Sequence, residues 1–100
     1  MGNAVMRYQT KPEAADQNEQ LVAKVFAELA EKKPAGLRYA SFRLADGVTF
    51  VHIVSTEGDG DPLSDIAAFK EFRRNFNDRV VGEPERSSGE LVGSYEFLTH

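Results

Sequence analysis

The chain begins with a short run, residues 3–9, in which apolar and polar positions alternate after Ala4. The run contains Val5 and Tyr8, which are residue types favoured in strands. A period of two is typical of a strand with one buried face, so we predict a first strand here.

The next segment changes period and predicts a long amphipathic helix. From Leu21 to Leu29 the apolar positions recur at intervals of three and four residues, and polar residues fill the remaining positions. Thr10–Glu13 matches a capping box, which predicts the start of this helix. Pro34 and Gly36 predict its end.

Two strand-like runs between Leu37 and Thr56 are separated by Asp46-Gly47. This dipeptide is a strong signal for a tight hairpin, because a type I′ turn needs positive φ at both central residues. With these two residues in the turn, Ser41 faces His52 across the hairpin.

The charged, glycine-rich residues 57–62 predict a loop that leads to a second helix capped by Asp61 or Ser64. Gly82 and Pro84 predict the end of that helix, whose apolar positions are Ile66, Phe69, Phe72, Phe76 and Val80. We expect a mobile connection over 85–89 and a last strand from Glu90 to Leu98.

These elements follow the order β-α-β-β-α-β, which is the ferredoxin-like split βαβ pattern of an α+β fold. Right-handed connections then place both helices on one face of a four-stranded antiparallel sheet and leave the other face bare. We expect residues 1–100 to form one domain, because a chain of this length supports one hydrophobic core.

The predicted register divides the hairpin side chains between the two faces of the sheet. We expect the side with Arg38, Ala40, Phe42, Leu44, Thr49, Val51, Ile53 and Ser55 to lie under the helices. The bare side then carries Tyr39, Ser41, Arg43, Phe50, His52 and Val54. Apolar area left in water forfeits roughly 25 cal/mol per Å², so we expect a second copy to cover this side in a homodimer.

Composition and charge exclude several classes of protein. The chain has no cysteine and no apolar run long enough to cross a bilayer, which argues against disulfides, thiolate metal sites and a membrane span. No secretory signal pattern opens it, so we expect a cytoplasmic protein. The net charge of -4 disfavours nucleic acid as a partner.

The element order, the Tyr8-x-x-Lys11-Pro12 passage and the phenylalanine-rich segment 66–72 resemble the dimeric α/β barrel superfamily, particularly its antibiotic-biosynthesis-monooxygenase-like branch. The resemblance implies dimerisation and a cavity in which aromatic or polyketide-like substrates are oxidised without metal or flavin. The haem-degrading branch uses a histidine on the second helix, where this chain has none, and the chain has no tryptophan. We therefore expect no cofactor and no metal.

His52 is the best candidate for an acid/base residue on the predicted bare face, where it could accept a phenolic proton from a substrate. The structural alternative is a neutral imidazole bonded to Ser41 or to a partner's backbone. Arg43 and Arg7 are candidates to bind a carboxylate or enolate oxygen. The structural alternative for Arg43 is a dimer salt bridge with an acidic residue such as Glu96, or an aromatic stack, and Arg7 has the same alternatives.

Tyr39 and Phe50 complete the candidate binding site as aromatic contacts to a small ligand, or serve as interface rings. Asp59 and Asp61 lack the further ligands of a calcium loop, so we expect a solvated loop there. Two hypotheses result: a homodimeric, cofactor-independent monooxygenase-like protein acting on a small aromatic molecule, or a non-catalytic homodimer that binds a small molecule or has only a structural role.

Overall fold

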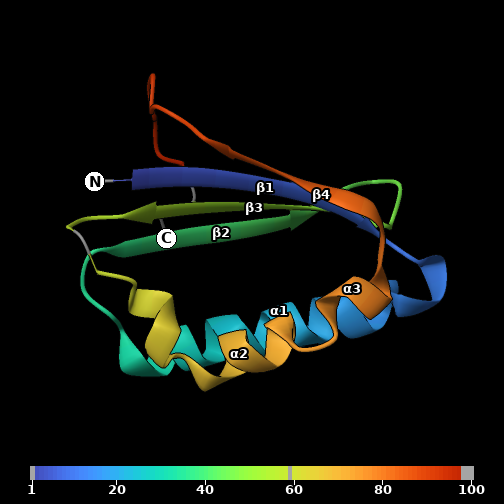
Figure 1. Ribbon diagram of the computed structural model, residues 1–100. Coiled ribbons are helices and arrows are strands. Elements are labelled where there is room, and N and C mark those ends of the chain that lie inside the picture. The colour runs from blue at the N-terminus through green and yellow to red at the C-terminus, as the bar shows by residue number, and fades with distance from the viewer. Residues whose placement is uncertain (1, 59, 98–100) are drawn as a thin grey trace.

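The structure is a computed structural model that describes residues 2–58 and 60–97. Its strands pair in the antiparallel order β2-β3-β1-β4, and the helices pack on one face of that sheet (Figure 1). The predicted α+β class and element order are confirmed. The elements are β1 (Gly2–Thr10), α1 (Ala15–Lys32), β2 (Leu37–Arg43), β3 (Thr49–Thr56), α2 (Ala67–Arg73), α3 (Phe76–Arg79) and β4 (Val80–Ser88), with 3-10 turns at Pro12–Ala14 and Pro62–Asp65.

The start of α1 differs from the capping-box prediction. Thr10 still belongs to β1, and its hydroxyl donates to the carbonyl of Val48 rather than to a helix end. Pro12 begins the 3-10 turn, and α1 follows without a side-chain cap. The end of α1 agrees with the prediction: Lys33 adopts φ 46° immediately before Pro34, which stops the helix.

The hairpin of β2 and β3 has the predicted register throughout, but its turn is longer. The N–H of Leu44 donates to the carbonyl of Thr49, so the loop comprises residues 45–48. Gly47 has φ 81°, whereas Asp46 stays at negative φ and its carboxylate accepts backbone N–H groups that follow it. The longer loop has the same centre as the predicted two-residue turn, and the register is therefore unchanged.

The last part of the chain differs most from the prediction. The second helix ends at Arg73, and the segment expected to be a mobile connection lies in β4, which pairs with β1. Gly82 and Pro84 lie inside this strand, next to an irregularity in its pairing with β1. An edge strand tolerates both residues at such a point, because the proline needs no ladder hydrogen bond there.

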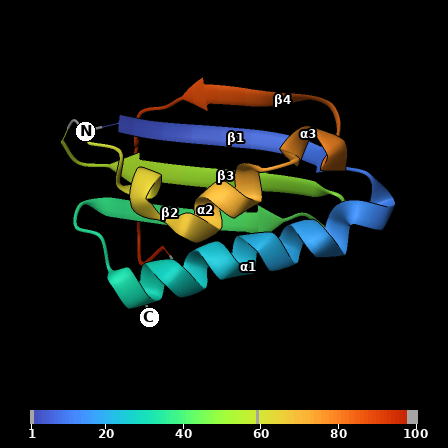
Figure 2. The ribbon, with the colours of Figure 1, turned by 60° about the horizontal axis from the view of Figure 1, so that its bottom comes forward.

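The strand predicted over 90–98 is therefore wrong within the described residues. Residues 89–97 form neither helix nor strand, and Leu98 lies outside the described residues. The segment after β4 passes over the sheet face that the helices leave open (Figures 1 and 2). There the ring of Phe97 lies 6.3 Å from that of Phe42 on β2.

The two faces of the sheet are also the reverse of the prediction. Phe50 and His52 are each only 2% exposed and face the helices, and the His52 ring lies 5.6 Å from Phe72 of α2. Tyr39 lies on the same side and packs edge-on against Phe26 of α1. The side chains predicted to be buried, Arg38, Ala40, Phe42, Val51, Ile53 and Ser55, share the open face instead.

The core lies between the sheet and the helices. Its buried apolar side chains are Tyr8, Val22, Val25, Phe50, Phe72 and Val80. Within residues 2–58 and 60–97, no helix has the length and apolar composition of a membrane span.

Candidate functional site

His52 is held in the core by two tyrosines from neighbouring strands. Tyr8 of β1 has its hydroxyl oxygen 2.8 Å from Nε2, and Tyr39 of β2 has its hydroxyl oxygen 2.7 Å from Nδ1. Both ring nitrogens are therefore hydrogen-bonded within the chain. The alternative partner Ser41 faces His52 in the register, but the imidazole bonds to the tyrosines instead.

The hydrogen-bonded chain continues from Tyr8 to the far end of the core. The Nδ2 group of Asn18 on α1 donates to the Tyr8 hydroxyl at 2.9 Å, and Nε of Arg79 donates to Asn18 Oδ1 at 3.1 Å. We call these five residues, Arg79, Asn18, Tyr8, His52 and Tyr39, the polar relay. It joins α3, α1 and three strands in one series of contacts.

Burial keeps the tyrosines and the histidine of the relay neutral. It lowers the pKa of His52 to about 4. Burial also raises the pKa of Tyr8 to about 12, although the Asn18 hydrogen bond and the Arg79 charge oppose it, and it raises the pKa of Tyr39. At neutral pH the charge within the relay is that of Arg79.

Arg79 is itself fixed in place by the helices. It is 5% exposed, and its guanidinium donates to the backbone carbonyls of Arg74 and Phe72. The same group lies 5.4 Å from the ring centre of Phe72 and 5.7 Å from that of Phe76. Backbone acceptors and aromatic faces together compensate the desolvation of this cation.

The sequence analysis missed Asn18 and Arg79. A signal was available, because Asn18 falls on the buried stripe of α1 in phase with Val22 and Val25. Arg79 similarly follows Phe72 and Phe76 at helical spacing. A polar residue at a core position of an amphipathic pattern indicates a buried hydrogen bond.

Tyr39 also borders a groove between the end of α1 and the start of β2. The groove has a volume of about 310 Å³ and is lined by Phe26, Leu29, Ala30, Lys33, Pro34, Leu37 and Tyr39. Among these residues Lys33 alone is charged. This volume and the apolar lining suit a small conjugated molecule. A second hollow of about 560 Å³, at the start of α1, is lined mainly by charged and polar groups.

Comparisons with known proteins identify the fold. No family model and no curated protein matches the chain. A crystal structure of an antibiotic biosynthesis monooxygenase matches with a TM-score of 0.70 and 20% identity, over 93% of this chain and all of that one. The chain therefore has the fold seen in structures of antibiotic biosynthesis monooxygenases. This agrees with the resemblance seen in the sequence.

Two further structures show how broad this fold group is. One is the structure of a variant of SnoaB from Streptomyces nogalater, which is described as a cofactor-independent oxygenase. It matches this chain with a TM-score of 0.64 and 17% identity, over 93% of this chain and 94% of that one. A protein of unknown function from Nitrosomonas europaea matches with a TM-score of 0.68 and 15% identity over 94% and 92%. The monooxygenase-like fold therefore does not by itself assign an activity.

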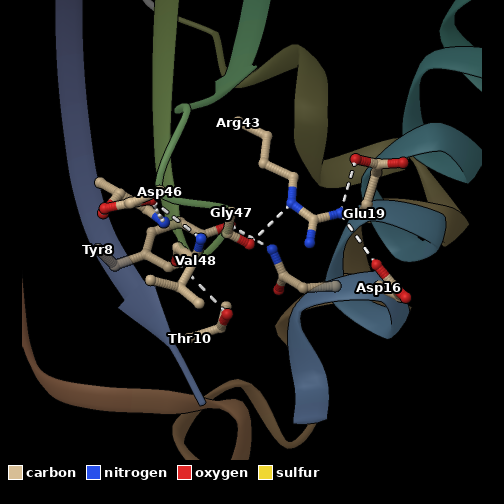
Figure 3. A network of polar contacts seen from close by, with 10 residues as sticks. Tyr8, Thr10, Asp16, Glu19, Arg43, Asp46, Gly47 and Val48 are labelled. Atoms are coloured by element: carbon tan, nitrogen blue, oxygen red, sulfur yellow. Dashed lines mark hydrogen bonds and ion pairs between the residues drawn. The ribbon is translucent and has the colours of Figure 1, made fainter. Parts of the chain in front are cut away.

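Within this monooxygenase-like fold, Arg43 connects β2 to α1 (Figure 3). Its Nη1 lies 3.0 Å from Asp16 and 3.1 Å from Glu19, and its Nε donates to the carbonyl of Gly47. Arg43 thus pairs with two acidic residues of its own chain. It lies near Phe50 but outside the relay.

Arg7 is separated from His52 by the sheet. It lies on the open face of β1, where its neighbours across the strands are Val51 and Glu85. The structure therefore brings together Tyr39, Phe50 and His52, places Arg43 at the edge of this group, and leaves Arg7 on the other side. The ring of Phe50 stacks on that of Tyr8, with 5.6 Å between the ring centres.

Among residues 2–58 and 60–97, no three His, Asp or Glu side chains lie together in an arrangement that could hold a metal ion. Asp61 accepts the N–H of Leu63 and caps the 3-10 turn that precedes α2. Asp59, the other aspartate considered for calcium, lies outside the described residues.

Proposed function

We propose that this chain is a cofactor-independent oxygenase-like protein that takes a small conjugated molecule into the groove at Tyr39. The observation that carries the proposal is that Tyr39 belongs both to the apolar groove and to the buried polar relay. Tyr39 is one of two members of the relay that border a hollow of ligand size, the other being Arg79 at the second hollow. The monooxygenase-like fold and the description of SnoaB support the same class of reaction.

The chemistry must draw its electrons from the substrate, because no cofactor takes part in it. In the simplest reaction a substrate methylene reacts with O₂ to form a carbonyl. One oxygen atom enters the substrate, and the other leaves as water with the two methylene hydrogens. Such a substrate reacts through its enolate or phenolate form, and a hydrogen bond from Tyr39 stabilises that oxyanion in an apolar site.

His52 then acts as a positioning residue, through Tyr39, more readily than as a general base. A pKa of about 4 makes it a weak base at neutral pH, and both of its nitrogens are already bonded. The same observation favours the second candidate function, a protein that binds a small molecule without turnover. The two functions differ in whether bound ligand consumes oxygen.

Oxygen uptake with anthrone, whose methylene is activated by a carbonyl and whose enol is a phenol, tests the oxygenase. We expect uptake by the wild type and a loss of about 10²-fold in Tyr39→Phe, because that variant removes one oxyanion donor. Tyr95→Phe is the matched control, since Tyr95 is 87% exposed. Equal uptake in the wild type and Tyr39→Phe would remove Tyr39 from the mechanism. Ligand binding without uptake would support the non-catalytic function.

We also infer that two copies pair through the open face of the sheet. The support is that this face carries partly exposed Val5, Phe42, Val51 and Ile53, and that the segment 89–97 beside it leaves further large apolar side chains in water. Leu91 is 71% exposed and Val92 is 99% exposed. A second copy of this chain offers the matching apolar surface.

Sedimentation at low micromolar concentration tests this homodimer. We expect the wild type to sediment as a dimer and Ile53→Asp as a monomer, because a carboxylate on the open face has no partner in the interface. Lys70→Asp is the matched control on the exposed surface of α2. A monomeric wild type would overturn the homodimer.

A further inference from the structure

The second hollow lies between the start of α1 and the turn that joins α2 to α3, and we call it the polar hollow. Figures 1 and 2 both place α3 beside the segment that leads into α1. The volume of about 560 Å³ admits a small organic molecule. Its charged lining residues are Lys11, Glu13, Glu71, Arg74, Asp78 and Arg79.

Arg79 is the one buried member of this charged set, and it has no buried counter-charge. It is 5% exposed, whereas the other five side chains are exposed. Its partners are Asn18 Oδ1 and the carbonyls of Arg74 and Phe72, which lower the cost of burial but carry no net charge. Among the described residues no carboxylate lies within ion-pair distance of it. A cation buried to this degree is ordinarily paired with an anion.

Arg79 also has hydrogen-bond donors to spare. A guanidinium carries five N–H groups, and the contacts to Asn18, Arg74 and Phe72 use three of them. Two N–H groups are thus left without an acceptor among the described residues. Because Arg79 lines the polar hollow, a molecule bound there is placed to supply both the acceptors and the missing negative charge.

The exposed charges around the polar hollow nearly cancel, so Arg79 determines its net charge. Glu71 pairs with Lys24 at 3.6 Å. The charges that remain are two cations and two anions, which form no ion pair among the described residues: Lys11, Arg74, Glu13 and Asp78. With Arg79 the sum is one positive charge. A ligand with a single negative charge balances it, whereas a phosphate monoester brings nearly two.

Asp78 is the side chain that competes for the role of counter-charge. Desolvation lowers the pKa of Arg79, and the negative charge of the adjacent Asp78 acts in the opposite direction. The Asp78 carboxylate is exposed and lies beyond ion-pair distance, so water screens its attraction to Arg79. Asp78 therefore compensates Arg79 only in part and repels an anionic ligand.

We propose that the polar hollow is a binding site for a small polar carboxylate, whose anionic group pairs with the Arg79 guanidinium. A charge-assisted hydrogen bond from a guanidinium to a carboxylate is stronger than one between neutral groups. The hydroxyl or amide groups of the ligand suit the polar lining around it. This site is separate from the groove at Tyr39 and does not rest on the proposed oxygenase.

Gluconate and sorbitol are the probes, because they share a six-carbon polyhydroxy chain and differ in the carboxylate. Nuclear magnetic resonance of the Arg79 Nε–H group follows binding to the wild type at constant ionic strength. We expect gluconate at millimolar concentration to shift this signal saturably, and sorbitol to leave it unchanged. No saturable shift with gluconate, or an equal shift with sorbitol, would overturn the site. Binding of inorganic phosphate as tight as that of gluconate would overturn the carboxylate as its ligand class.

Two variants locate the bound carboxylate. Asp78→Asn removes the competing charge and should tighten gluconate binding about threefold. Glu83→Gln is the matched control, because it makes the same charge change at an exposed position of β4 outside the hollow, and its affinity should equal that of the wild type. Equal affinities in the two variants would overturn the placement at Arg79. Oxygen uptake does not enter this test, so its failure leaves the proposed oxygenase to be judged by its own experiment.

Discussion

The two faces of this sheet invert the usual relation between polarity and burial. The face under the helices carries His52, Tyr39 and Tyr8 around Phe50, whereas the opposite face carries Val51, Ile53, Phe42 and other aliphatic or aromatic groups that are partly exposed. Within the β2–β3 hairpin, ranked by hydropathy alone, the second face is the one to bury. The structure buries the first.

The difference shows that satisfied polar groups can be core residues. Within the described residues no buried side-chain nitrogen or oxygen lacks a hydrogen bond. A buried polar group is costly when it is unpaired, and the polar relay pairs each of its members with another. The large rings of Tyr8, Tyr39 and His52 then contribute their apolar area to the core. The relay thus makes the more polar face suitable for burial.

Truncating one phenylalanine on each face tests this comparison most strongly. Phe50→Ala should lower the free energy of unfolding by about 3–5 kcal/mol, because it opens a cavity beside Tyr8. Phe42→Ala should cost only about 1 kcal/mol in the monomer, because Phe42 is partly exposed. Urea denaturation at low protein concentration measures both. Equal costs would mean that the two faces are equally buried.

The pH dependence of stability tests the burial of His52. Its pKa falls from 6.5 to about 4 on folding, so the unfolded chain binds more protons between these values. Stability should therefore be complete above pH 6.5 and decline as the pH falls toward 4, by about 3 kcal/mol. Tyr8, Tyr39 and Arg79, the ionisable groups of the relay, keep their charge states in this window.

The variant His52→Gln isolates this effect from the carboxylates that titrate in the same range. Hydrogen bonds lower the pKa values of Glu28 and Asp46, so the stability that these carboxylates contribute is lost as the pH falls, in the wild type and in the variant alike. The difference between the wild type and the variant should carry the His52 contribution alone. Parallel stability curves for the two proteins between pH 4 and 6.5 would show that His52 is not desolvated.

The fold could be predicted from the sequence because it depends on local patterns. The Leu21–Leu29 stripe and the Asp46-Gly47 turn fix the first helix and the hairpin register. The predicted position of the last strand was wrong because Gly82 and Pro84 disfavour a central strand. The sequence did not show that β4 would be an edge strand, where both residues are tolerated. Edge position is a property of the assembled sheet.

The candidate site could be predicted only in part. His52 and Tyr39 were recognised as chemically distinct residues, but their burial depends on partners that are far away in sequence. Tyr8 lies 44 residues from His52, and Asn18 lies 61 residues from Arg79. Hairpin periodicity alone cannot tell which face the helices cover, because both faces contain large apolar side chains. The helices cover the face on which polar residues distant in the sequence form hydrogen bonds with one another.

Removing each tyrosine hydroxyl of the relay sharpens the comparison within the buried face. Tyr8→Phe should lower the free energy of unfolding by about 2–3 kcal/mol, because Asn18 and His52 each lose a buried partner. Tyr39→Phe should cost about 1 kcal/mol, because only the His52 Nδ1 group loses its partner, beside the groove. Thermal or urea denaturation ranks the two variants. The reverse order would show that the hydroxyl of Tyr39, rather than that of Tyr8, makes the larger contribution to the core.

Arg43→Gln should give the smallest change of the set, although Arg43 contacts two carboxylates. Its partners Asp16 and Glu19 are 88% and 59% exposed, so water and salt screen the attraction. We expect a slight loss of stability at low ionic strength that disappears in molar salt, because ions screen the pairs in the wild type as well. Urea midpoints at two salt concentrations measure it. A loss that persists in high salt would show that Arg43 stabilises the fold by packing over Phe50 rather than by charge.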